Sequence, residues 1–517
     1  MHKANSFLIA GLLLIPSLAA ASAQGIDLQA LLHMTLPQEL GRVSEAAQPV
    51  AASSSPKIVI LIEDAHVNAG AQRNLAGIIR YLADAYQVRL ILVEGGDGDV
   101  GLSYMREWMP EEMRRSMAED YLAQGMLSGE EYADLVSDQP LVLWGIEDRA
   151  LYEANFQAFL EANELQPALA KHLAFARQLV KALLPKLGNA PLRQYLSQRS
   201  AFAAGTLELS GYVRFLGELC LSLGIDGGLF PHTVRFLEIQ QSEQTKDAQQ
   251  LALEQKQVIE QIVSQCPREA VKPLIDAAKA LQAKTGSRQA YNQELARLIQ
   301  AYSISLEPFP QVKRYLRREE LKEAFDARQL LNETREMEKA AGARLAASEE
   351  ERALVSFERD LLLRENLVGL KWQPADYEEY SREKNAGWFS HWLPWLKERA
   401  AKAGLPWEAQ QESVALQVDS DLNRMVRFYQ AARERESAMA LHVADKLLRE
   451  KGAAAVLIVG GFHTESLRAL LHEQGLATIV VSPAVSEKND PDRYATVMRR
   501  KRFGKFKAQE TMAEVRE

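Results

Sequence analysis

Two short apolar runs, placed near opposite ends of the chain, each lead into a histidine. Residues 57–66 read KIVILIEDAH, and residues 453–463 read AAAVLIVGGFH. Short runs rich in β-branched residues, bounded by polar or glycine-rich turns, are typical of buried strands. In an open parallel sheet, the residues just after the carboxyl ends of the strands line the ligand crevice. We therefore expect His66 and His463 to converge at one edge of a parallel sheet.

Strand-like and helical segments alternate in two separate parts of the chain, 57–155 and 411–498. The first part contains three predicted strands, at 58–62, 88–93 and 141–144. Strand–helix–strand alternation at this spacing implies right-handed crossovers and a parallel sheet. The sequence thus predicts an α/β fold whose parallel-sheet core is made from an N-terminal and a C-terminal segment.

The middle of the chain, residues 156–410, has a different character. It is rich in Ala, Leu, Gln, Glu, Lys and Arg, and residues 244–263 and 319–365 show long amphipathic helical patterns. Such helices can form a bundle or an antiparallel coiled arm. We interpret the region as a long all-helical structural insertion. The aromatic stretch 388–395 within it is either a partly exposed lid or a packed core.

The two ends of the chain carry signals of their own. Residues 1–23 contain Lys3, a short apolar stretch and the small-residue pattern Ala21-Ser22-Ala23, which predict a cleaved signal peptide and export to the periplasm or outside the cell. A membrane anchor is the alternative, but the apolar stretch is short for a spanning helix, and we expect no other integral membrane segment. Residues 24–56 read as a linker, and 499–517 as a basic tail that is solvated or weakly contacts an anionic membrane.

Charge and cysteine content restrict the function further. The formal net charge of −8 argues against a nucleic-acid-binding protein, which usually carries a basic excess. The two cysteines, Cys220 and Cys266, stand in no C-x-x-C pair or nucleophile motif. Export would permit a disulfide between them, and two unpaired buried thiols are the alternative.

Polar residues follow each of the four predicted strands of the core. They are Glu63, Asp64 and His66; Glu94; Glu147 and Asp148; and Gly460, Gly461 and His463. His66, Glu94 and His463 together could ligate a divalent ion such as Zn²⁺, Mn²⁺ or Co²⁺. Without a metal, a histidine held by a carboxylate could take a proton from water. Around these, we expect the cofactor contacts to come from Glu63, Asp64, Gly460 and Gly461.

A fourth candidate for the chemistry lies on the helix that precedes the second histidine. Arg435 and Met439 are four positions apart and therefore share a helix face. Arg435 could reach the crevice and bind a substrate carboxylate or phosphate through its planar guanidinium, while Met439 packs beneath it. An exposed, ion-paired arginine is the alternative.

The order of these motifs resembles the superfamily that joins Tiki proteases, TraB-type proteins, ChaN-like haem-binding proteins and erythromycin esterases. The matching segments are Asp64-Ala65-His66, Glu94, Arg435 to Met439, and Gly460-Gly461-Phe462-His463. The ChaN-like branch is the most similar, through His66-Val67-Asn68 followed by Ala71-Gln72. The early motif of the superfamily is usually Gly-x-x-His, and here Glu63 takes the place of that glycine, which adds a ligand or alters the chemistry.

The resemblance implies three kinds of activity. Tiki members are metal-dependent proteases, the esterases use a histidine-activated water, and ChaN-like members bind haem iron. Our first hypothesis is an exported hydrolase-like protein acting on a small molecule or peptide, in which His66, Glu94, His463 and Arg435 carry the chemistry. The second is a haem- or iron-binding protein, with Tyr152 and Tyr429 as candidate axial ligands. The third is a non-catalytic scaffold that binds a partner through its helical insertion.

Overall fold

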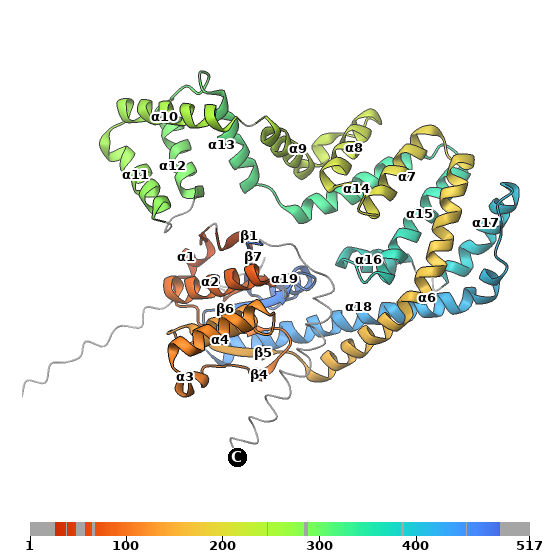
Figure 1. Cartoon of the computed structure of the whole chain (residues 1–517), viewed down its shortest axis with the longest axis horizontal. Coiled ribbons are helices and arrows are strands. Elements are labelled where there is room, and N and C mark those ends of the chain that lie inside the picture. The colour runs from red at the N-terminus through yellow and green to blue at the C-terminus, as the bar shows by residue number, and fades with distance from the viewer. Residues whose placement is uncertain are drawn as a thin grey trace, which may run out of the picture.

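A computed structural model describes residues 26–485, apart from 38, 48–56, 65–67, 246, 284–287, 384–386 and 451. The predicted signal peptide, the basic tail and His66 lie outside the described residues. The described chain forms a seven-stranded sheet and a much larger helical region (Figure 1). None of the helices in these residues is long and apolar enough to cross a bilayer.

The sheet has the strand order β1-β7-β2-β6-β3-β5-β4. Its strands are β1 (Gly41–Ala47), β2 (Ile58–Asp64), β3 (Leu90–Val93), β4 (Asp97–Asp99), β5 (Val142–Ile146), β6 (Ala454–Gly460) and β7 (Ala477–Pro483). The five inner strands β7, β2, β6, β3 and β5 are parallel, and the outer strands β1 and β4 pair antiparallel at the two edges. The predicted α/β fold is confirmed: the C-terminal strand β6 lies between the N-terminal strands β2 and β3.

Helices cover both faces of the sheet. The helices around it are α1 (Leu28–Leu32), α2 (Ala69–Tyr86), α3 (Met105–Trp108), α4 (Glu111–Ala123), α5 (Gly129–Val136) and α19 (Thr464–Glu473). Alternate residues of β2 point to opposite faces, so Ile60 packs with α1, α2 and α5 whereas Leu61 packs with α19. Because these strands are buried on both faces, they read in the sequence as continuous apolar runs.

The region 24–56 is more than the linker that we predicted. Its described part contains helix α1 and strand β1, which pairs with β7 from Gly41↔Pro483 to Ala47↔Thr478. Leu31 in α1 is fully buried against the sheet. This segment therefore belongs to the α/β core.

Two long helices connect the sheet to the helical region. They are α6 (Arg149–Leu187), which leaves the sheet after β5, and α18 (Gln410–Arg449), which returns to it before β6. The pair is antiparallel: Asn155 bonds the carbonyl of Phe428 near the sheet, and His172 contacts Gln411 far from it. We call α6 and α18 the stalk. Because both helices are continuous, the predicted boundaries at 155 and 410 fall at or inside a helix of the stalk.

The remaining helices lie beyond the stalk. They are α7 (Ala190–Ala203), α8 (Leu209–Ser222), the 3₁₀ turn η1 (Gly227–Leu229), α9 (Pro231–Gln244), α10 (Ala248–Gln265), α11 (Arg268–Gln282), α12 (Arg288–Ala301), α13 (Pro310–Glu323), α14 (Ala327–Leu345), α15 (Glu349–Val368), α16 (Pro374–Glu383) and α17 (Trp388–Lys402). Figure 1 shows α7 to α14 curving away from the stalk and back above the sheet. We call the described residues of 188–348 the arm. The stretch 319–365, predicted as one helical pattern, is divided among α13, α14 and α15.

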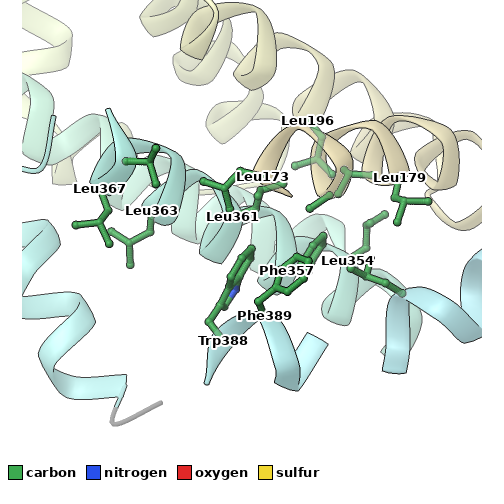
Figure 2. Packing of buried hydrophobic residues seen from close by; sticks show 14 of the residues in the cluster. Leu173, Leu179, Leu196, Leu354, Phe357, Leu361, Leu363, Leu367, Trp388 and Phe389 are labelled. Carbon is green, nitrogen blue, oxygen red and sulfur yellow. The ribbon is translucent and has the colours of Figure 1, made fainter. Parts of the chain in front are cut away.

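A large apolar cluster packs the stalk against α7, α8, α14, α15 and α17. Phe357 is fully buried at its centre, and its ring stacks on Trp388 with ring centroids 5.9 Å apart (Figure 2). Trp388 and Phe389 of the aromatic stretch are both buried, so these residues form packed core and not a lid. A second, smaller apolar cluster holds α10 to α13 together at the far end of the arm.

Candidate functional site

The carboxyl ends of the central strands bring the predicted polar groups to one edge of the sheet. Asp64 at the end of β2 is in register with Gly460 at the end of β6. The amide of Glu94, just after β3, donates to the carbonyl of Ile458 on β6 at 3.2 Å. The amide of Glu147, just after β5, donates to the carbonyl of Gly96 at 2.9 Å. The four strands are parallel neighbours, as the sequence predicted.

Glu94 lies at the centre of this arrangement. Its Oε2 accepts a hydrogen bond from the amide of Gly460 at 2.9 Å. Its Oε1 faces Nη2 of Arg435 at 3.3 Å and Nε2 of His463 at 3.6 Å. The side chain is 16% exposed. Glu94 therefore ties together the late histidine motif and the arginine of the preceding helix.

Arg435 is buried on α18, and its guanidinium contacts three polar side chains and one aromatic ring. Its guanidinium pairs with both carboxylate oxygens of Glu147 and donates to Oδ1 of Asn155 at 2.7 Å. Tyr152 covers its face, with the ring centroid 5.0 Å from Cζ. Burial alone would lower the pKa of Arg435, but the carboxylates of Glu147 and Glu94 outweigh burial and raise it. Arg435 is thus a fixed cation that holds two carboxylates, and the alternative of an exposed ion pair is wrong.

His463 is oriented by Glu436, a second residue of α18. Its Nδ1 lies 2.8 Å from Oε1 of Glu436, the buried residue that follows Arg435 in the sequence. Its ring meets Phe462 edge-on, and Phe462 packs in turn against Tyr429. When Nδ1 donates its proton to Glu436, the lone pair of Nε2 faces Glu94. Glu436, His463 and Glu94 therefore form a line of three polar groups at the sheet edge.

Glu63 and Asp64 point to different neighbours. Glu63 accepts a hydrogen bond from Oγ of Ser482 at 2.6 Å and forms an ion pair with Arg328 of the arm. Asp64 accepts a hydrogen bond from the amide side chain of Gln72 on α2. A Cβ added to Gly461 would lie 3.9 Å from Oε1 of Glu63, so Glu63 borders the turn that leads to His463.

Of the predicted set of His66, Glu94 and His463, the structure places Glu94 and His463, because His66 lies outside the described residues. In the part of the chain that the structure describes, no group of three or more His, Cys, Asp and Glu side chains is arranged to hold a metal ion. Nε2 of His463 and Oε1 of Glu94 are 3.6 Å apart. Two ligands that each bind an ion at about 2 Å come to roughly this separation, so the pair fits two positions of a divalent metal site. Glu436 then fits the carboxylate that orients a metal-bound histidine from behind.

The two candidate haem ligands have other roles. Tyr152 packs on the guanidinium of Arg435, and the hydroxyl of Tyr429 accepts a hydrogen bond from the amide of Trp372 at 3.0 Å. Burial raises the pKa of Tyr429 well above its usual range, which disfavours the phenolate that would bind ferric iron. Both side chains therefore support the site from within the protein.

Three residues of the site were absent from the predicted set of functional residues. Glu147 was visible in the sequence as a polar residue at a strand end, and Glu436 as a neighbour of Arg435. Neither signal shows that Glu147 pairs with Arg435 or that Glu436 contacts His463. Asn155, in the second turn of α6, had no signal, because only the packing of α6 on α18 brings it to Arg435. Cys220 and Cys266 are both free and buried, so the disulfide alternative is wrong.

Comparisons of the chain with protein-family models, with curated proteins and with solved structures found no match.

Proposed function

We propose that the protein is an exported hydrolase whose reaction takes place at the carboxyl ends of β3 and β6. The observation that carries this proposal is the line of Glu436, His463 and Glu94. A histidine whose Nδ1 is held by a buried carboxylate presents Nε2 in a fixed orientation, as a general base requires. The substrate class is a small molecule or peptide with a hydrolysable acyl or related bond.

In this proposal each residue has a defined task. Nε2 of His463 takes a proton from a water molecule as the water oxygen attacks the electrophilic carbon, and returns that proton to the leaving group. Glu436 stabilises the imidazolium that forms in between. Arg435 holds the carboxylates of Glu94 and Glu147 in place, so its task is to hold the site and not to anchor the substrate. His66, two residues after β2, is a further candidate base from the sequence.

A divalent metal at the same residues is the alternative form of this site, because an Nε2 that binds a metal has no lone pair left to accept a proton. His463 and Glu94 would supply two ligands, and His66 is the candidate for a third. A bound metal of this kind lowers the pKa of water and polarises a carbonyl group. The protein's own contribution would remain the orientation of His463 by Glu436 and of Glu94 by Arg435 and the Gly460 amide.

The first test asks whether the protein hydrolyses anything and what it contains. The purified full chain is assayed on panels of esters, amides and phosphoesters, and its metal content and visible absorbance are measured. We expect hydrolysis of one class, and no Soret band after addition of haem. Activity on none of the three classes, or a stoichiometric Soret band, would overturn the proposal.

Variants then locate the activity. His463→Ala and His66→Ala should each lower the rate while the circular dichroism spectrum stays unchanged. His442→Ala is the matched control, because His442 lies on α18 with Nδ1 3.0 Å from the carbonyl of Ile146 and outside the line of three groups. Full activity in both His463→Ala and His66→Ala contradicts the proposed site.

A further inference from the structure

The arm touches the edge of the sheet at the candidate site. Arg328, in the first turn of α14, forms an ion pair with Glu63 at the end of β2. The same carboxylate accepts the hydroxyl of Ser482 on β7, and it borders Gly461. In the described part of the chain, the arm's other ion pairs stay within the helical region. The Arg328–Glu63 pair is thus a bond between the arm and the strand ends.

The surroundings of this bond are charged. Next to Arg328, Arg468 of α19 pairs with Glu45 on β1 and with Glu465. The side chains of Arg328 and Glu63 are 37% and 21% exposed, although the Nη2 atom of Arg328 that meets Glu63 is buried. A charged, partly solvated contact can open without exposing an apolar core, and its strength depends on salt. The cluster at the far end of the arm is separate from the two clusters of the sheet. Helices α7, α8 and α14 pack in the stalk cluster, so the movement that we consider is one of the arm beyond these contacts, which stay in place.

We propose that the Arg328–Glu63 pair is a latch that fastens the arm across the strand ends, and that release of this latch admits substrate to the site. The purpose of the latch rests on the proposed function. The candidate groups need such a step, because the side chains of His463 and Glu94 are only 9% and 16% exposed.

The latch is tested in the full chain by charge reversal. Arg328→Glu should release the arm, and the double variant Glu63→Arg with Arg328→Glu should fasten it again. Lys339→Glu is the matched control, because Lys339 lies on the same helix and pairs with Glu336 inside the arm. Small-angle scattering reports the position of the arm through the radius of gyration. Hydrogen exchange of peptides over 58–64 and 460–466 reports the strand ends.

We expect Arg328→Glu to increase the radius of gyration and to raise exchange at the strand ends about threefold or more, as for loss of a partly exposed ion pair. The double variant and Lys339→Glu should match the wild type. Unchanged scattering and exchange in Arg328→Glu would overturn the latch.

A second measurement needs no variant. Raising the salt from about 0.01 M to about 1 M shortens the Debye length from about 30 Å to about 3 Å and should move the wild type in the same direction. Wild-type scattering and exchange that do not change with salt would also overturn the latch. Both readouts are independent of catalysis: a latch that opens in a protein without hydrolytic activity rejects the proposed function alone, and an active protein with an immobile arm rejects the latch alone.

Discussion

Replacing Arg435 with methionine removes the cation between two carboxylates while keeping a side chain of similar length. The side chain of Glu147 is fully buried and that of Arg435 is 7% exposed. Once the guanidinium is gone, Glu147 keeps only the amide of Gly95, at 3.2 Å, as a described hydrogen-bond donor. Breaking a buried ion pair by removing one partner costs about 3–5 kcal/mol, because a buried charge is left without compensation.

This loss of stability should be measured in the sheet itself, because a chain with a sheet domain and a helical region need not unfold in one step. Native-state hydrogen exchange over β3 and β6 reports the opening of the sheet itself. At about 1.36 kcal/mol for each factor of ten, exchange there should accelerate by about two to nearly four orders of magnitude. Arg433→Met is the control: Arg433 stacks on Tyr377, 5.3 Å from its centroid, on the same helix, and its loss should cost about 1 kcal/mol or less.

A second substitution checks the cause. Adding Glu147→Gln to Arg435→Met removes the buried charge that has lost its partner. The double variant should therefore be more stable than the sum of the stability losses of the two single variants predicts. Acceleration of exchange by less than tenfold in Arg435→Met, or strict additivity in the double variant, would refute the argument that this ion pair holds the strand ends.

Three further predictions concern other parts of the molecule. Phe357→Ala removes a fully buried ring from the large apolar cluster around the stalk. It should lower the free energy of unfolding of the helical region by about 3–5 kcal/mol. A loss below about 1 kcal/mol in urea unfolding would contradict that packing. Cys220 and Cys266 are free and buried, so Ellman's reagent without reductant should label them slowly in the native protein. Both should react fully once the protein is unfolded. An unfolded protein without free thiols would show a disulfide instead. Burial and the nearby Arg468 lower the pKa of His472, so its contribution to stability is present above the ordinary histidine pKa of about 6.5 and is lost as pH falls through the lowered value. His472→Gln should therefore flatten the loss of stability between about pH 7 and pH 5, and an unchanged slope would contradict this.

The sheet was predictable because its central strands are buried on both faces. Continuous β-branched runs such as 58–62 carry that information in the sequence itself. The edge strand β1 was missed because only one end of it is buried, and its sequence GRVSEAA has no apolar run.

Part of the site was predictable for the same reason. Parallel neighbours end at one edge, so the adjacency of Glu94 and His463 follows once β3 and β6 are paired. The partners of Arg435 could not be foreseen in this way. Helical periodicity places Arg435 on the face of α18 that carries Met439, but it does not specify that α6 brings Asn155 to the same face.

The shape of the helical region was also beyond the sequence. Amphipathic patterns show that each helix has an apolar face, but many partners can cover such a face. The structure selects a stalk and an arm that curves back to the sheet, where Arg328 meets Glu63. A pair of charged residues so far apart in the chain leaves no local pattern.

In the proposed function, Nε2 of His463 performs the proton transfer. The most direct test is kcat/KM of the wild type and of His463→Gln on the substrate class selected by the panels. We expect kcat/KM to fall about 10²- to 10⁴-fold in His463→Gln, the usual contribution of a positioned general base, and to stay within about twofold of the wild type in His442→Gln. Equal values of kcat/KM for the wild type and a folded His463→Gln protein would rule out proton transfer by His463.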